Sequence, residues 1–153
     1  MANTYTQLYI HFVFVVQDRA SLINKLWKDE LYKYITAIVQ NKKHKLISIN
    51  GMPDHIHLFV GLNPQSSISN LMKDVKASSS KWINEKGFVK GKFRWQLGYG
   101  AFSYSQSHIS NVINYIENQE HHHKKLTFNE EYKLFLEKYN VDFDIKYLFN
   151  NVN

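Results

Sequence analysis

Hydrophobic residues fall into blocks along the chain, and the first block predicts a strand. Residues 8–16 are apolar or aromatic almost throughout and contain no Asp, Glu, Lys or Arg. A continuous run of this kind is typical of a central strand that is covered on both faces. His11 interrupts the run and shares a face with Val13 and Val15. We interpret it as a hydrogen-bonded core histidine.

Two longer blocks have helical periodicity. In residues 23–41 and 68–85, apolar side chains recur at spacings of three and four residues, with lysines between them. A serine in the loop 64–67 is placed to cap the second block. Both blocks therefore predict amphipathic helices packed on a sheet. Their apolar faces are marked by Leu26, Trp27, Leu31, Tyr34 and Ile38, then by Ile68, Leu71, Met72, Val75, Ser79 and Trp82.

A hairpin lies between these helices. Residues 45–50 and 55–61 predict two strands, and the turn 51–54 joins them with glycine and proline. Alternate residues of a strand point to opposite faces, so the second strand has one apolar face and one face that carries two histidines. These faces consist of Ile56, Leu58 and Val60, and of His55, His57 and Phe59.

The last third of the chain predicts one more strand and two helices. Residues 93–105 are rich in aromatic side chains and predict a strand from about Phe93 that is bent or bulged near Gly98 and Gly100. Helices are expected at about 108–124 and 128–139, and an aromatic-rich segment follows at 142–149.

The order β-α-β-β-α-β-α predicts an α+β fold. It is that of a ferredoxin-like or RRM-like split β-α-β antiparallel sheet, with helices on one face and a C-terminal helical extension. No internal repeat, low-complexity tract or linker is visible, so residues 1–153 are expected to form one domain. Its core would span about 5–125 and its extension about 126–153.

Composition narrows the class of protein. The 153 residues are 44% hydrophobic and 21% charged, which is globular rather than disordered. The absence of cysteine excludes disulfides and thiolate metal sites, and it fits a cytoplasmic protein. No signal peptide or membrane span is visible, so no membrane partner is expected. The net charge of +6 favours a polyanionic partner such as nucleic acid.

Two short motifs carry candidate chemistry. His55 and His57 share one face of a strand, and Tyr115, Gln119 and His122 share one stripe of a helix. Imidazoles and an amide oxygen can hold a divalent cation with positions open for substrate. Such a cation can neutralise a phosphoryl oxygen, and it favours the phenolate form of a neighbouring tyrosine. The pattern therefore predicts a metal site with a tyrosine nucleophile for displacement at phosphorus.

Simpler readings of these residues stay open. The histidine pair could face solvent, and Tyr115 could be a half-buried helix tyrosine whose hydroxyl lies at the surface. The run His121, His122 and His123 could be placed near a helix C-terminus by the helix dipole alone. His122 lies on the stripe of Tyr115, so we hold it as a reserve ligand.

The two motifs together resemble a known family. His55-Ile56-His57 is similar to the HUH motif, and Tyr115-Ile116-x-Asn118-Gln119-x-x-His122-His123 resembles the single-tyrosine motif of the small transposases of the insertion sequence 200/605 group. The REP-associated tyrosine transposases carry a similar signature. The segment 95–103 and the context Met52-Pro53-Asp54 also resemble this family, and the likeness covers essentially the whole chain.

The resemblance implies a metal-dependent DNA transposase. His55, His57 and Gln119 would hold Mg2+ or Mn2+, and Tyr115 would cleave single-stranded DNA to give a 5′-phosphotyrosine and a free 3′-hydroxyl. The family recognises imperfect hairpins near element ends. It works as a homodimer in which the tyrosine helix of one subunit completes the histidine pair of the other.

Other functions and the DNA contacts are less sharply indicated. The alternatives are a non-catalytic or domesticated hairpin DNA-binding protein, and a metal-dependent phosphodiesterase that uses water. Phosphates need Lys or Arg, and unpaired bases stack on aromatic rings, although these lysines could equally be ordinary surface charge. The candidate DNA contacts are Lys73, Lys76, Lys92, Arg94 and Trp95.

Overall fold

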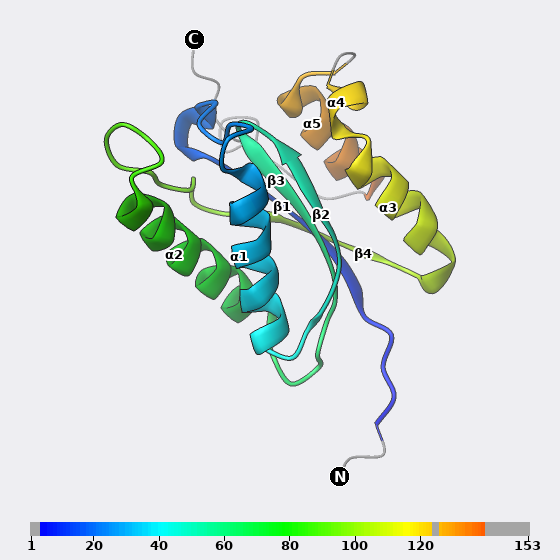
Figure 1. Ribbon diagram of the computed structural model, residues 1–153. Helices are drawn as coiled ribbons and strands as arrows, with labels where there is room; N and C mark the ends of the chain where they lie inside the picture. The colour runs from blue at the N-terminus through cyan, green and yellow to red at the C-terminus, as the bar shows by residue number, and fades with distance from the viewer. Residues whose placement is uncertain (1–3, 124–125, 140–153) are drawn as a thin grey trace.

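A four-stranded antiparallel sheet forms the centre of the protein. The computed structural model describes residues 4–123 and 126–139. Its strands lie in the order β2-β3-β1-β4, and Figure 1 shows α1 and α2 side by side across one face of the sheet. The strands are β1 (Tyr9–Val15), β2 (Lys45–Met52), β3 (His55–Gly61) and β4 (Gly100–Tyr104), and the two long helices are α1 (Lys28–Asn41) and α2 (Ile68–Lys86). The predicted α+β fold is confirmed.

The central strands bury side chains on both faces. Phe12 and Phe14 of β1 and Leu58 of β3 belong to the larger core, which α1 and α2 cover. Val13 and Val15 point the other way and pack with Phe102 of β4 and with α5 (Phe128–Lys138). This alternation agrees with the expectation that β1 is covered on both sides.

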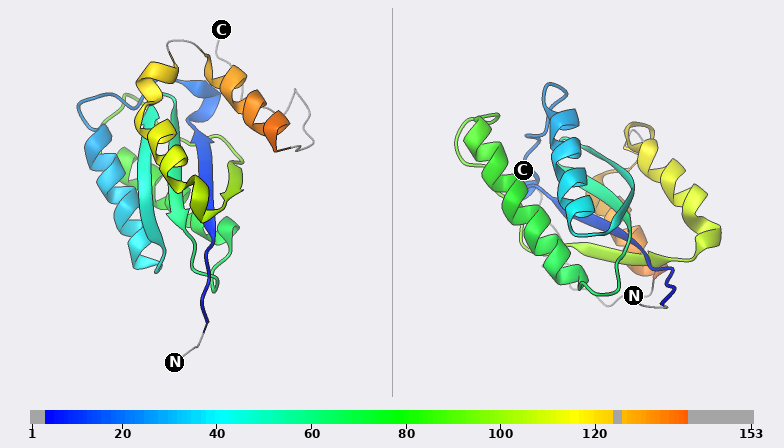
Figure 2. Two further views of the ribbon diagram at one scale, coloured as in Figure 1. Left: turned by 90° about the vertical axis from the view of Figure 1, so that its right-hand side faces the viewer. Right: turned by 60° about the horizontal axis from the view of Figure 1, so that its bottom comes forward.

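The helices cover both faces, which differs from the expected single layer. α3 (Ile109–Glu117) and α4 (Gln119–His122) follow the β2 side of the second face, and α5 crosses the β1 and β4 side (Figure 2). Phe59 of β3 packs against Val112 and Ile116 of α3. The second face carries too much apolar surface to stay in water, so the C-terminal helices cover it.

Helix boundaries follow local hydrogen bonds. α1 begins five residues later than the expected position 23, because the side chain of Asn24 accepts the Leu26 N–H and the Ile23 N–H is bonded to the Pro53 carbonyl. Ser67 caps α2 by accepting the Asn70 N–H, as the sequence indicated. The aromatic-rich segment 142–149 lies outside the described residues.

The predicted bend near Gly98 and Gly100 is confirmed, but the strand itself is shorter than expected. β4 starts only at Gly100, and the register against β1 shifts by two residues between the Val13–Gly100 pair and the isolated Val16–Trp95 bridge. Gly98, with a φ of 86°, lies within this shift.

The expected helix 108–124 is divided in two. Asn118 separates α3 from α4 with φ and ψ of −101° and 29°. Its backbone and side-chain N–H groups both bond to the Asn114 carbonyl, at 3.1 and 2.7 Å. The Gln119 side chain still lies one turn from Tyr115 and donates to the Tyr115 carbonyl at 3.4 Å. The break therefore preserves the shared stripe of these two residues.

Gly51 is the tightest backbone approach in the hairpin that carries the histidines. A Cβ atom at this position would lie 2.2 Å from the His55 carbonyl oxygen, which is backbone and cannot rotate away. We expect Gly51→Ala to lower the free energy of unfolding by about 1–3 kcal/mol, the usual cost of overpacking. Urea titration followed by circular dichroism would measure it.

Gly61→Ala is the matched control, because its nearest neighbour would lie at an ordinary contact distance of 3.4 Å. Equal free energies of unfolding in the two variants would contradict this prediction, since they would show that the backbone around Gly51 can accommodate a Cβ atom.

Candidate metal centre and nucleophile

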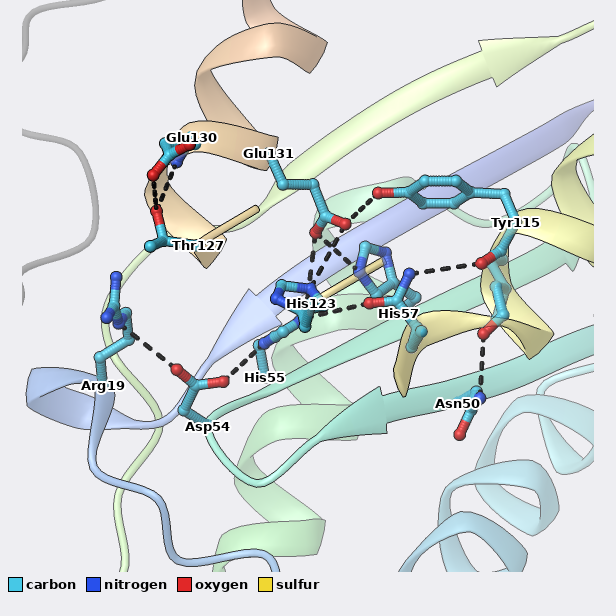
Figure 3. Close-up of polar contacts among 12 residues, drawn as sticks. Arg19, Asn50, Asp54, His55, His57, Tyr115, His123, Thr127, Glu130 and Glu131 are labelled. Carbon is cyan, nitrogen blue, oxygen red and sulfur yellow. Dashed lines mark hydrogen bonds and ion pairs between the residues drawn. The ribbon is translucent and has the colours of Figure 1, made fainter. Parts of the chain in front are cut away.

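The two histidines of β3 lie on the second face of the sheet and are completely buried. His55 and His57 each have 0% exposure, and Figure 3 shows both rings pointing toward the helices that cover this face. Their shared face follows from the alternation along β3, as the sequence predicted. The solvent-facing alternative for this pair is therefore excluded.

His55 is oriented by a carboxylate. Its Nδ1 lies 2.6 Å from Asp54 Oδ1, and the other Asp54 oxygen pairs with Arg19 Nε at 3.3 Å. Burial alone would raise the pKa of Asp54, but the hydrogen bond and the charges of His55 and Arg19 lower it. Because the ionised carboxylate can only accept, His55 Nδ1 donates and Nε2 presents its lone pair to the site.

His57 is oriented by another histidine. His11 of β1 places Nε2 2.8 Å from His57 Nδ1, and both rings are fully buried. Burial first, and the neighbouring imidazole next, lower the pKa of His11; burial also lowers the pKa of His57. Both rings are therefore neutral, and one N–H is shared between them. The prediction that His11 is a hydrogen-bonded core histidine is confirmed, and its partner is a candidate metal ligand.

Gln119 and Tyr115 reach the same place from the C-terminal helices. Gln119 is fully buried, and its Oε1 lies 3.3 Å from His55 Nε2. The ring centroid of Tyr115 lies 5.8 Å from that of His57. Asn50 of β2 holds the end of α3 by donating to the Ile116 carbonyl at 2.9 Å. The stripe predicted from sequence thus faces the histidine pair of its own chain.

Glu131 of α5 is a member of this site that the sequence analysis missed. It is buried, with 4% exposure, and its Oε1 lies 3.2 Å from His57 Nε2. The Tyr115 hydroxyl donates to its other oxygen, Oε2 (Figure 3). One signal was available: Glu131 falls three residues after Phe128 and four before Phe135, on the stripe of α5 that packs inward.

These contacts set the protonation of the acid and the phenol. Burial would raise the pKa of Glu131, but its contacts with His123, His57 and Tyr115 hold it well below the ordinary value. Burial, together with the negative charge of Glu131, raises the pKa of Tyr115 far above 10. The carboxylate is thus ionised, and the phenol keeps its proton.

One ligand atom from each of four residues lies within 4.8 Å of the others, so this cluster could hold a metal ion. Its members are His55, His57, His123 and Glu131. Neutral imidazoles with fixed orientations and a buried carboxylate suit a divalent cation. The side chain of His122, the reserve candidate, is outside the described part of the chain, so its role stays a prediction.

A pocket of about 370 Å³ opens beside the nucleophile candidate, between α3 and α5. Its wall includes His11, Tyr104, His108, Tyr115 and Phe135. Aromatic and imidazole rings of this kind can stack on unpaired bases.

The candidate DNA contacts line a separate pocket of about 790 Å³ on α2 and the segment 92–97. Lys73, Lys92 and Arg94 are exposed there. The Lys76 ammonium instead donates to the carbonyls of Gln96 and Gly98, at 2.6 and 2.8 Å. Trp95 is only 8% exposed and its indole N–H donates to Ser79. Trp95 is therefore mainly a core residue and a poor stacking platform.

Across the described residues, no helix has the length and apolar character that a bilayer crossing requires.

Comparisons with known proteins place this site in a family context. Residues 4–119 match the family model "Transposase IS200 like". The ISDra2 transposase TnpA of Deinococcus radiodurans is 25% identical over 118 residues, covering 74% of this chain and 84% of that protein.

Two solved structures share the fold. A proposed transposase of Deinococcus radiodurans R1 matches with a TM-score of 0.61 and 22% identity, over 78% of this chain and 95% of that one. A REP-associated tyrosine transposase bound to a REP hairpin matches with a TM-score of 0.62 and 13% identity, over 100% of this chain and 96% of that one.

The orientation of His55 can be tested through Asp54. We expect Asp54→Asn to weaken Mn2+ binding about 10- to 100-fold, the usual effect of removing an outer partner of a metal ligand. An amide lacks the negative charge that favours the Nδ1–H form of His55. Titration calorimetry would measure the affinity. Asp18→Asn, which removes an exposed carboxylate next to Arg19, should bind Mn2+ like the wild type; a loss shared by both variants would argue against an effect specific to His55.

Proposed function

Because the chain belongs to the IS200-like transposase family, we propose that it is a metal-dependent enzyme that cleaves and rejoins single-stranded DNA. Tyr115 is the nucleophile, and His55, His57 and Gln119 hold the divalent ion. The observation that carries this proposal is convergence: the amide oxygen of Gln119 lies 3.3 Å from His55 Nε2, while Tyr115 lies beside His57.

The proposed reaction is a displacement at phosphorus. The Tyr115 oxygen attacks the phosphodiester, the new bond to phosphorus forms as the bond to the 3′-oxygen breaks, and the released 3′-end takes up a proton. A divalent ion bound by the histidines would neutralise a phosphoryl oxygen and favour the phenolate. The Tyr115 proton points at Glu131. The 5′-phosphotyrosine keeps the energy of the phosphodiester, so attack by a second 3′-hydroxyl can rejoin the strand.

The DNA partner is a single strand with hairpin ends. The exposed cations Lys73, Lys92 and Arg94 provide a surface for phosphates. This surface is connected to the histidine site around the end of β1: the Arg94 carbonyl accepts the Gln17 N–H, and Arg19 of the same loop pairs with Asp54. A strand bound along Arg94 would thus be directed toward the site.

Each site is proposed to work within one chain. Tyr115 and Gln119 lie against the histidines of their own chain, so assembly of the site requires no second copy. A homodimer, which the family resemblance implies, remains an expectation about the oligomeric state.

The nucleophile is tested with labelled single-stranded hairpin DNA and Mn2+ or Mg2+. We expect the wild type to become covalently labelled on a denaturing protein gel, and Tyr115→Phe to lose this band by at least about 10³-fold, because no other group can form the phosphotyrosine. Tyr34→Phe on α1, on the opposite side of the sheet, is the control and should label normally.

Cleavage without a labelled protein band, unchanged in Tyr115→Phe, would instead identify a phosphodiesterase that uses water. DNA binding without cleavage would indicate a hairpin-binding protein. An equimolar mixture of Tyr115→Phe and His57→Ala should stay inactive; recovered activity would mean that subunits share sites.

The basic surface is tested by Lys92→Ala and Arg94→Ala. We expect each to weaken hairpin binding and to reduce the slope of log affinity against log salt by about 1, because each removes one phosphate contact. Fluorescence anisotropy at several salt concentrations would measure both quantities. Lys33→Ala, which removes an exposed lysine of α1, should leave the slope unchanged. An equal change of slope in Lys33→Ala would mean that DNA is attracted by the net charge of the protein and not by this surface.

A further inference from the structure

α5 brings a carboxylate into a site whose histidine pair, Tyr115 and Gln119 lie in the family-matched segment. The family model ends at residue 119, whereas Glu131 and His123 lie beyond it. Nevertheless Glu131 is buried and packs directly against the histidine pair. Its side chain therefore reaches the site from outside the family-matched segment.

The carboxylate oxygens lie at ligand-shell distances from three imidazoles. Glu131 Oε1 is 3.2 Å from His57 Nε2 and 3.9 Å from His55 Nε2, and Oε2 is 3.4 Å from His123 Nε2. Ligands that bind one ion with bonds of about 2.1 Å are separated by about 3.4 Å in a tetrahedral arrangement. The four residues therefore need only small shifts to share one ion.

The charge of Glu131 also calls for a cation. Burying a carboxylate is costly unless it is paired. Among the described residues, its ion-pair partners are His55, His57 and His123, none of them a lysine or arginine. The cation Arg19 pairs with Asp54 on the other side of His55, so among the described residues no lysine or arginine neutralises the charge of Glu131.

We propose that Glu131 and His123 are additional ligands of the ion held by His55 and His57, and that this set selects a first-row transition ion over Mg2+. The inference rests on the proposed function, since it concerns the same metal centre. Mg2+ prefers an octahedron of oxygens and keeps several waters, whereas three imidazoles and one carboxylate, together with the Gln119 amide oxygen, suit Mn2+, Fe2+ or Zn2+. Because Glu131 Oε2 also receives the Tyr115 hydroxyl, the same carboxylate positions the nucleophile next to the ion.

The test measures Mn2+ binding without DNA, from the electron paramagnetic resonance signal of free Mn2+. We expect one site per wild-type chain, a loss of affinity of at least about tenfold in Glu131→Gln, and no detectable site in His57→Ala. Glu137→Gln is the matched control, since it removes the same charge from an exposed position of α5. Competition should show Mg2+ binding at least about tenfold more weakly than Mn2+ in the wild type.

Three results would contradict the proposed ligand set. Wild-type affinity in Glu131→Gln, equal affinity for Mg2+ and Mn2+, or no Mn2+ binding without DNA would each overturn the proposal. Loss of the site in His57→Ala alone would leave the proposed function intact, and the phosphotyrosine assay tests that function separately. Thermal melting in EDTA checks folding; if Glu131→Gln does not fold, His123→Ala tests the same ligand set and should show the same loss.

Discussion

Burial of imidazole and carboxylate groups on one face of a sheet is the constraint on which this structure depends. A buried polar atom without a partner costs about 1–3 kcal/mol, and this face carries His11, His55, His57, Gln119 and Glu131, all buried. Each of these side chains contacts a group from a different element, although His11 Nδ1 has no hydrogen-bond partner among the described residues. The partners of β3 come from β1, from the turn before β3, from α4 and from α5. The contacts within the site therefore constrain how β1, α4, α5 and the turn before β3 pack against β3.

One face of the sheet carries most of the apolar core, and the other face carries the polar site. The face under α1 and α2 is almost entirely apolar and includes Phe12, Phe14, Leu58 and their neighbours. The other face has two smaller apolar clusters, around Val13 and around Phe59, and the polar site runs beside them. The stability supplied by the first core allows the second face to hold polar groups whose net contribution to folding is small.

The sequence predicted what depends on periodicity and missed what depends on which element covers which face. Alternation along β3 placed His55 with His57, and helical spacing placed Tyr115 with Gln119. The division of that helix at Asn118 went unseen, because the break keeps the same stripe. Glu131 was missed because a charged residue in an amphipathic helix normally faces water, and nothing local indicates that α5 crosses the histidine face. From the sequence, Trp95 is a candidate stacking platform, because no local pattern indicates that it is buried. Its burial depends on the bulge before β4, which the sequence does not specify in detail.

The position of Glu131 has a consequence for how the proposed nucleophile, Tyr115, would be controlled. One carboxylate contacts both a candidate metal ligand and the Tyr115 hydroxyl, so movement of α5 must change both contacts together. Without a metal ion, burial and a nearby negative charge both oppose ionisation of a phenol. Here the same negative charge would also attract the proposed cation, and a cation between the carboxylate and the imidazoles would reverse this effect. In the proposed metal centre, the ionisation of Tyr115 and the binding of the ion would therefore be coupled through Glu131, whose position depends on the packing of α5 through Phe128 and Tyr132.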